Sequence, residues 1–139
     1  MSETKKARLR VVSLMRDMDG DKNEIKNAHL GTCREDGDTV VLEYDDVQDG
    51  ERAHIELHCA ENRAKMIRKG MTSAQLTFIP GQRTSSAYVT MYGEIPVMVD
   101  TRQVLRSLCE NGGDLLLNYD VYVGGDMTAR TELRVTWRV

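Results

Sequence analysis

The sequence has few of the features that mark exported, membrane-spanning or disulfide-stabilised proteins. Its three cysteines, Cys33, Cys59 and Cys109, are an odd number at long spacings, which excludes a disulfide framework and a Cys-x-x-Cys pair. No run of about 18 apolar residues occurs, and the first residues are charged rather than apolar. We therefore expect a cytoplasmic protein without membrane insertion.

An excess of charge of one sign is also missing. The 139 residues carry a formal net charge of -3, which gives no global field to attract phosphate backbones, so we expect no nucleic-acid partner. A chain of this length builds one domain, residues 1–139, and can form a core without metal or disulfide support.

Turn signals recur every ten to twenty residues along the chain. Glycine follows Asp, Lys, Pro, Tyr, Asn or another glycine at eight places: Asp19-Gly20, Asp36-Gly37, Asp49-Gly50, Lys69-Gly70, Pro80-Gly81, Tyr92-Gly93, Asn111-Gly112-Gly113 and Gly124-Gly125. Most of these pairs favour hairpin turns, because glycine accepts the positive φ that such turns require. This spacing is typical of antiparallel strands joined in sequence.

The segments between the turns alternate apolar and polar residues with a period of two. In residues 129–139 the apolar side chains Leu133, Val135 and Trp137 alternate with charged ones, and residues 39–44, 52–59, 74–78 and 114–123 behave similarly. Residues 100–110 fit either a short helix or a strand. If the sheet that these strands form closes into a barrel, no strand edge stays exposed. We therefore predict an all-β, up-and-down antiparallel barrel of about 8–10 strands with at most one short helix.

Three segments carry a family resemblance. They are residues 71–81, ending in Phe-Ile-Pro-Gly, residues 86–101, with Ser-x-Tyr-x-Thr-x-Tyr-Gly, and residues 112–122, with Gly-Gly-x-x-x-x-x-Tyr-Asp-x-Tyr. The chain resembles the YwiB-like family of bacterial proteins, a domain of unknown function. The resemblance covers nearly the whole chain. It implies a lipocalin-like barrel of the calycin type and no established activity.

A polar strand face is the main candidate for a binding site. If residues 86–92 form one strand, its hydroxyl-bearing side chains share a face and could orient a bound ligand. The alternative is a solvent-exposed face on which Tyr and Thr occur because they favour strands. Nearby arginines could hold an anionic head group. The candidate ligand-binding residues are Arg68, Arg83, Ser86, Tyr88, Thr90, Tyr92 and Tyr119.

Other motifs fail on geometry. In His54-x-Glu56-x-His58 the two histidines stand about 13 Å apart on a strand, so they cannot share a metal ion. Residues 17–24 resemble a calcium loop but lack its glycine and its final glutamate, and are expected to form a charged hairpin tip. No nucleophile–base pair and no cofactor motif occur. We expect no metal, no cofactor and no enzymatic activity.

Two functions remain. The first is non-covalent binding of a small amphipathic ligand in the barrel, which rests on the fold. The second is a protein-interaction or assembly module with a solid core. A homodimer is compatible with both.

Overall fold

The computed structural model describes residues 3–48 and 50–139, which form ten strands and, within these ranges, no helix. The strands are β1 (Lys5–Asp17), β2 (Lys22–Asp36), β3 (Thr39–Gln48), β4 (Glu51–Cys59), β5 (Ala64–Lys69), β6 (Ser73–Phe78), β7 (Arg83–Thr90), β8 (Gly93–Cys109), β9 (Gly112–Val123) and β10 (Asp126–Arg138). The described part of the chain accordingly has no helix that could cross a membrane.

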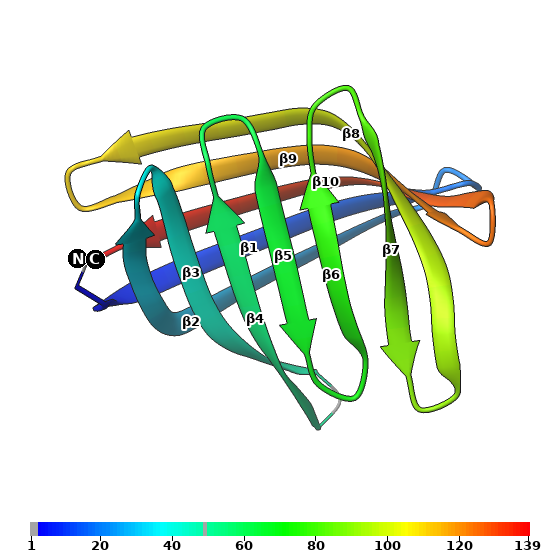
Figure 1. Cartoon of the computed structure of the whole chain (residues 1–139), viewed down its shortest axis with the longest axis horizontal. Helices are drawn as coiled ribbons and strands as arrows, with labels where there is room; N and C mark the ends of the chain where they lie inside the picture. The colour runs from blue at the N-terminus through cyan, green and yellow to red at the C-terminus, as the bar shows by residue number, and fades with distance from the viewer. Residues whose placement is uncertain (1–2, 49) are drawn as a thin grey trace.

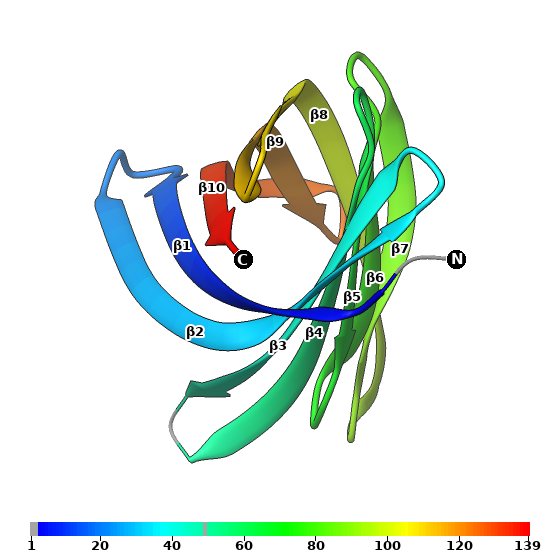
Figure 2. The same ribbon diagram turned by 90° about the vertical axis from the view of Figure 1, so that its left-hand side faces the viewer.

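The strands close into one antiparallel barrel, as the turn spacing predicted. Each strand pairs with its neighbours in sequence, and β1 pairs with β10 to close the ring. The long strands β2 and β8 cross between two halves of the barrel: β2 pairs first with β1 and then with β3, and β8 pairs first with β7 and then with β9 (Figure 1). Figure 2 shows the curved strands from the end at which β10 finishes.

A glycine allows β2 to turn this corner. A Cβ atom at Gly31 would collide with the backbone oxygen of Glu43 and approach a Leu9 methyl group to 3.0 Å. Only glycine therefore permits the close contact between β2 and β3, in line with the meaning of glycine inside a strand.

The predicted alternation places the core correctly. All of Ala53, Ile55, Leu57 and Cys59 on β4 are buried, and the inward residues of the last strands join them. Side chains from opposite walls, including Leu42, Val97, Leu115 and Val135, are almost completely excluded from solvent. The middle of the barrel is therefore filled by packed side chains.

Residues 100–110 fitted a helix or a strand, and residues 100–109 belong to β8, while Glu110 begins the following turn. The pairing of β8 with β9 shifts between Thr101 and Gln103, so a bulge at Arg102 interrupts the alternation. The bulge leaves Thr101 and Val104 both buried at a spacing of three, which imitates the period of a helix.

The second half of β8 is tied to the ends of β3 and β4. Arg106 donates hydrogen bonds from Nη1 to the backbone oxygens of Asp38 at 2.6 Å and Cys59 at 2.9 Å. These bonds join segments that are 68 and 47 residues apart in sequence. Arg106 thus holds two hairpin turns against one strand.

The seam between β6 and β7 is the least regular contact between adjacent strands. Its ladder consists of two residue pairs, Ser73 with Val89 and Ala74 with Tyr88. Beyond them, the Thr84 hydroxyl donates to the Thr77 oxygen at 2.6 Å. Hydroxyl groups therefore bridge part of the seam where backbone groups would normally pair.

Most predicted turns occur where glycine indicated them, but at Tyr92-Gly93 and at Asn111-Gly112-Gly113 the turn lies slightly earlier, so that the glycines already belong to the following strand. The turn between β8 and β9 is formed by Glu110 and Asn111, whereas Gly112 and Gly113 already belong to β9. Asp49, in the turn predicted at Asp49-Gly50, lies outside the described residues.

Candidate functional site

Three of the predicted site residues point into the barrel. Cross-strand pairing places Arg68 and Tyr88 on either side of Ala74, in a row that also contains Ile55. Tyr119 is buried, and its ring packs against Phe78 with the ring centres 4.7 Å apart. Arg68, Tyr88 and Tyr119 therefore share the interior of the barrel.

The electrostatics of this interior group follow from burial. The Arg68 guanidinium lies 4.0 Å from the Asp46 carboxylate, which is a loose ion pair. Burial raises the pKa of Tyr88, an effect that the nearby Arg68 charge opposes, and burial also raises the pKa of Tyr119. These phenols stay neutral at physiological pH and can act as hydrogen-bond donors.

The other predicted residues do not join them. Arg83 pairs with Asp100 at 3.3 Å and covers the Tyr122 ring, with 4.5 Å between the guanidinium carbon and the ring centre. Ser86 donates its hydroxyl hydrogen to the Gln75 carbonyl across the seam. Each therefore already has a partner within the barrel wall.

The predicted polar strand face included Tyr92, and this part of the prediction was wrong, because the strand ends before that residue. Strand β7 stops at Thr90, whose hydroxyl bonds the Tyr92 amide and the Gly93 carbonyl within the turn. Tyr92 is 94% exposed at the tip of that hairpin. The alternation of polar and apolar residues continues through Met91 and Tyr92, so it could not show that the strand ends at Thr90.

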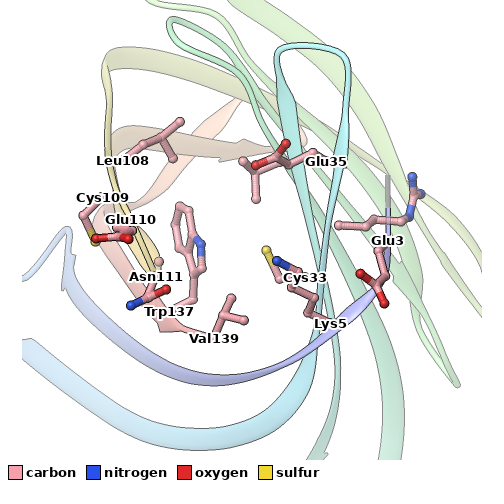
Figure 3. Close-up of a pocket in the computed structure, with 13 residues that line it drawn as sticks. Glu3, Lys5, Cys33, Glu35, Leu108, Cys109, Glu110, Asn111, Trp137 and Val139 are labelled. Carbon is pink, nitrogen blue, oxygen red and sulfur yellow. The ribbon is translucent and has the colours of Figure 1, made fainter. Parts of the chain in front are cut away.

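A pocket lies at the end of the barrel where β10 finishes (Figure 3). It has a volume of about 390 Å³ and is bounded by the start of β1, the β2–β3 hairpin, the β8–β9 hairpin and the end of β10. Pockets that hold small molecules typically occupy about 300–1,000 Å³. This hollow is therefore large enough for a small ligand.

The floor of the pocket is formed by Trp137. Its ring is 1% exposed, and its indole nitrogen faces Cys33 across the pocket (Figure 3). The ring fits because β9 carries no side chain beneath it: a Cβ atom at Gly113 would lie 2.6 Å from Trp137 Cζ2. The glycine pair that resembled a turn thus creates room for the indole.

Apolar and charged groups divide the walls of the pocket. Val40 and Leu108 add apolar surface beside the indole, and Lys5 and Glu35 contribute opposite charges at the β1–β2 side. Among the residues that the structure describes, Lys5 makes no ion pair. An apolar floor beneath a charged rim suits an amphipathic guest.

The thiols of Cys33 and Cys59 are poorly suited to nucleophilic chemistry. Burial, with a further contribution from the Glu35 charge, raises the pKa of Cys33. Burial raises the pKa of Cys59 to about 12. Both thiols therefore remain protonated at neutral pH, whereas reactive cysteines have lowered pKa values.

The histidine motif lies on the outside of the barrel, as its alternation predicted. The carboxylate oxygens of Asp45 and Glu43 accept hydrogen bonds from the His54 ring nitrogens, Nδ1 at 2.9 Å and Nε2 at 3.1 Å, and His58 Nε2 contacts Glu56 at 2.8 Å. In residues 3–48 and 50–139, no group of three His, Cys, Asp or Glu side chains is arranged to hold a metal ion.

Sequence reasoning missed the pocket because its residues come from four distant segments. They belong to residues 3–5, 33–40, 108–112 and 137–139, and each segment is short and without a recognisable motif. The adjacent glycines at 112 and 113 were the one available signal, but a turn explained them equally well.

Comparison with known proteins identifies a family and a matching fold. The "Uncharacterized beta-barrel protein YwiB" of Bacillus subtilis (strain 168) is 23% identical over 129 residues, which are 93% of this chain and 90% of that protein. The crystal structure of ywiB protein from Bacillus subtilis superimposes with a TM-score of 0.88 at 22% identity, covering 97% of this chain and 92% of that chain. Residues 10–135 match a domain of unknown function, DUF1934. The chain therefore belongs to the DUF1934 family, whose function is not established.

Proposed function

We propose that this protein binds a small amphipathic molecule non-covalently in the pocket above Trp137. The single observation that carries the proposal is a hollow of about 390 Å³ with a buried indole as its floor. The apolar part of the ligand would pack on Leu108 and Val139, above the buried Trp137 ring, while its polar end would meet the charged rim near Lys5.

This location differs from the one that the sequence favoured. The middle of the barrel is filled, and the interior residues Arg68, Tyr88 and Tyr119 contact other protein side chains. Their participation in ligand binding stays a prediction, as does the absence of enzymatic activity.

Two variants at one position test the pocket. Cys33 is half-buried on its wall, so Cys33→Phe should fill the space with a ring, whereas Cys33→Ser leaves it nearly unchanged. The apolar anionic dye anilinonaphthalene sulfonate serves as the probe, and quenching of Trp137, the only tryptophan in the chain, reports its binding. We expect Cys33→Phe to abolish quenching and Cys33→Ser to preserve it.

A third variant separates this pocket from the interior group. Arg68→Met should leave dye binding unchanged, provided that urea unfolding confirms an intact fold. Quenching that persists in Cys33→Phe but disappears in Arg68→Met would refute the pocket and favour the interior group.

The filled core supports a second candidate, a protein-interaction module. Denaturing mass spectrometry of the purified protein distinguishes the two candidates. A stoichiometric small molecule supports the pocket, while its absence together with a co-purifying polypeptide supports the module.

A further inference from the structure

The outer face of β2, β1 and β10 collects an unusual share of the basic residues. These three strands are adjacent in the barrel (Figure 1). Along the stretches where β2 and β10 pair with β1, the outward positions of the three strands hold nine of the 19 lysines and arginines of the chain, namely Lys6, Arg8, Arg10, Arg16, Lys22, Lys26, Arg130, Arg134 and Arg138. We call this surface the basic face. All nine side chains are exposed.

The basic face stands out because the protein as a whole is acidic, with a net charge of -3. The same outward positions hold two carboxylates, Glu24 and Glu132, so most acidic residues lie elsewhere. Two ion pairs involve this face, Lys26 with Glu24 at 3.1 Å and Arg130 with Asp120 at 3.1 Å. The other seven cations make no ion pair within the described part of the chain.

Strand pairing also places like charges directly opposite each other. Arg8 faces Arg138, and Arg16 faces Arg130. Such pairs destabilise a sheet, because the two charges repel at short range. A sheet that only needed a soluble surface could alternate the signs of these residues, so the arrangement points to an anionic partner.

Apolar side chains interrupt the basic face in a regular way. A hollow of about 500 Å³ is lined by the apolar side chains Val12 and Leu14. The cations at its walls are Arg10, Lys26 and Arg134, and the two carboxylates Glu24 and Glu132 also line it. Another, of about 760 Å³, is lined by Arg8 and Arg138 beside Leu30. Leu30 is 84% exposed. Guanidinium groups bind carboxylates through paired hydrogen bonds, and the hollows between them fit aliphatic side chains.

We propose that the basic face docks an acidic polypeptide segment that carries aliphatic side chains between its carboxylates. This inference rests on the second proposed function, the interaction module, and not on the pocket. Charge complementarity supplies the attraction, and the apolar hollows supply contact area that a purely ionic surface lacks.

Two features favour a polypeptide over nucleic acid. The row Glu24–Leu14–Glu132 crosses the face next to its Arg16 end, so a continuous phosphate backbone that followed the strands would meet two carboxylates there. The outward positions of these strands between residues 6–32 and 130–138 carry no aromatic ring on which bases could stack.

The experiment uses a fluorescein-labelled synthetic peptide of alternating glutamate pairs and leucines, with binding followed by fluorescence anisotropy. The double variant Arg10→Gln/Arg134→Gln should weaken binding by at least about tenfold, since two charge-assisted contacts are lost. The matched control Arg52→Gln/Arg63→Gln removes the same charge from exposed positions elsewhere and should change affinity less than about twofold. Leu30→Ser should weaken binding by about threefold or more, because an apolar contact is lost.

Several results would overturn the proposal. Equal losses in both double variants would show a general charge effect. Tighter binding of duplex DNA, or of phosphatidylglycerol vesicles, with no effect of Leu30→Ser would assign the face to a different partner. A concentration-dependent dimer in sedimentation that Arg10→Gln/Arg134→Gln abolishes would make a second copy the occupant. Failure of the peptide to bind, while another polypeptide still co-purifies, would refute this face and leave the interaction module standing.

Discussion

Replacing Gly113 by alanine should destabilise the protein, because the added methyl group would clash with Trp137 at the floor of the pocket. The added methyl group would lie 2.6 Å from Trp137 Cζ2 and 2.7 Å from the backbone oxygen of Ser107. Ordinary van der Waals contact requires more than 3.4 Å, so one neighbour must move. Trp137 is almost fully buried and the Ser107 oxygen belongs to β8, so neither moves easily.

The magnitude follows from two opposing effects. Overpacking a core costs about 1–3 kcal/mol, while replacing glycine by alanine stabilises by about 0.4–1 kcal/mol through the unfolded chain. The net loss should be about 1–2 kcal/mol, which corresponds to a fall of about 3–6 °C in Tm for a domain of this size. Urea unfolding followed by circular dichroism and by Trp137 fluorescence measures it.

A double-mutant cycle identifies the cause. In a Trp137→Leu background the nearest aromatic carbon is gone, so Gly113→Ala should cost about 0.5–1 kcal/mol less than in the parent protein. An unchanged cost would place the strain at Ser107 alone. A neutral Gly113→Ala would refute the packing argument for the pocket floor.

Three other perturbations test the supports of the barrel. Arg106→Gln removes two charge-assisted hydrogen bonds to backbone carbonyls and should cost about 2–4 kcal/mol in urea unfolding, so a loss below about 0.5 kcal/mol would contradict the tie. Hydrogen bonding to Asp45 is the main effect that raises the pKa of His54 above 6.5. Protonated His54 therefore stabilises the folded protein fully below pH 6.5, and this stabilisation is lost as the pH rises through the raised pKa. Because His54 is exposed, the loss should be about 0.5 kcal/mol, and His54→Gln should remove this pH dependence of the unfolding free energy. Thr84→Val should speed amide hydrogen exchange in β6 and β7, whereas Thr128→Val, which removes a hydroxyl–carbonyl bond between β9 and β10, should leave that seam unchanged.

Alternation predicted the core well where strands are regular and failed where they are not. Along β4 the period of two is unbroken, and its four apolar residues are all inside. Along β8 the bulge at Arg102 shifts the inward phase, which no local pattern separates from a helical one. At Tyr92 the alternation continued into a turn, so its polar face extended beyond the strand.

The sequence by itself determined the all-β class, the number of strands within narrow limits and the inner face of most of them, because period and turn chemistry are local properties. Tertiary structure alone decided the pocket and the basic face. The pocket needs four distant segments to meet around Trp137, and the basic face needs β10 to pair with β1, whose other edge pairs with β2. Barrel closure joins the two ends of the chain, and the surfaces that result depend on pairing between residues more than a hundred positions apart.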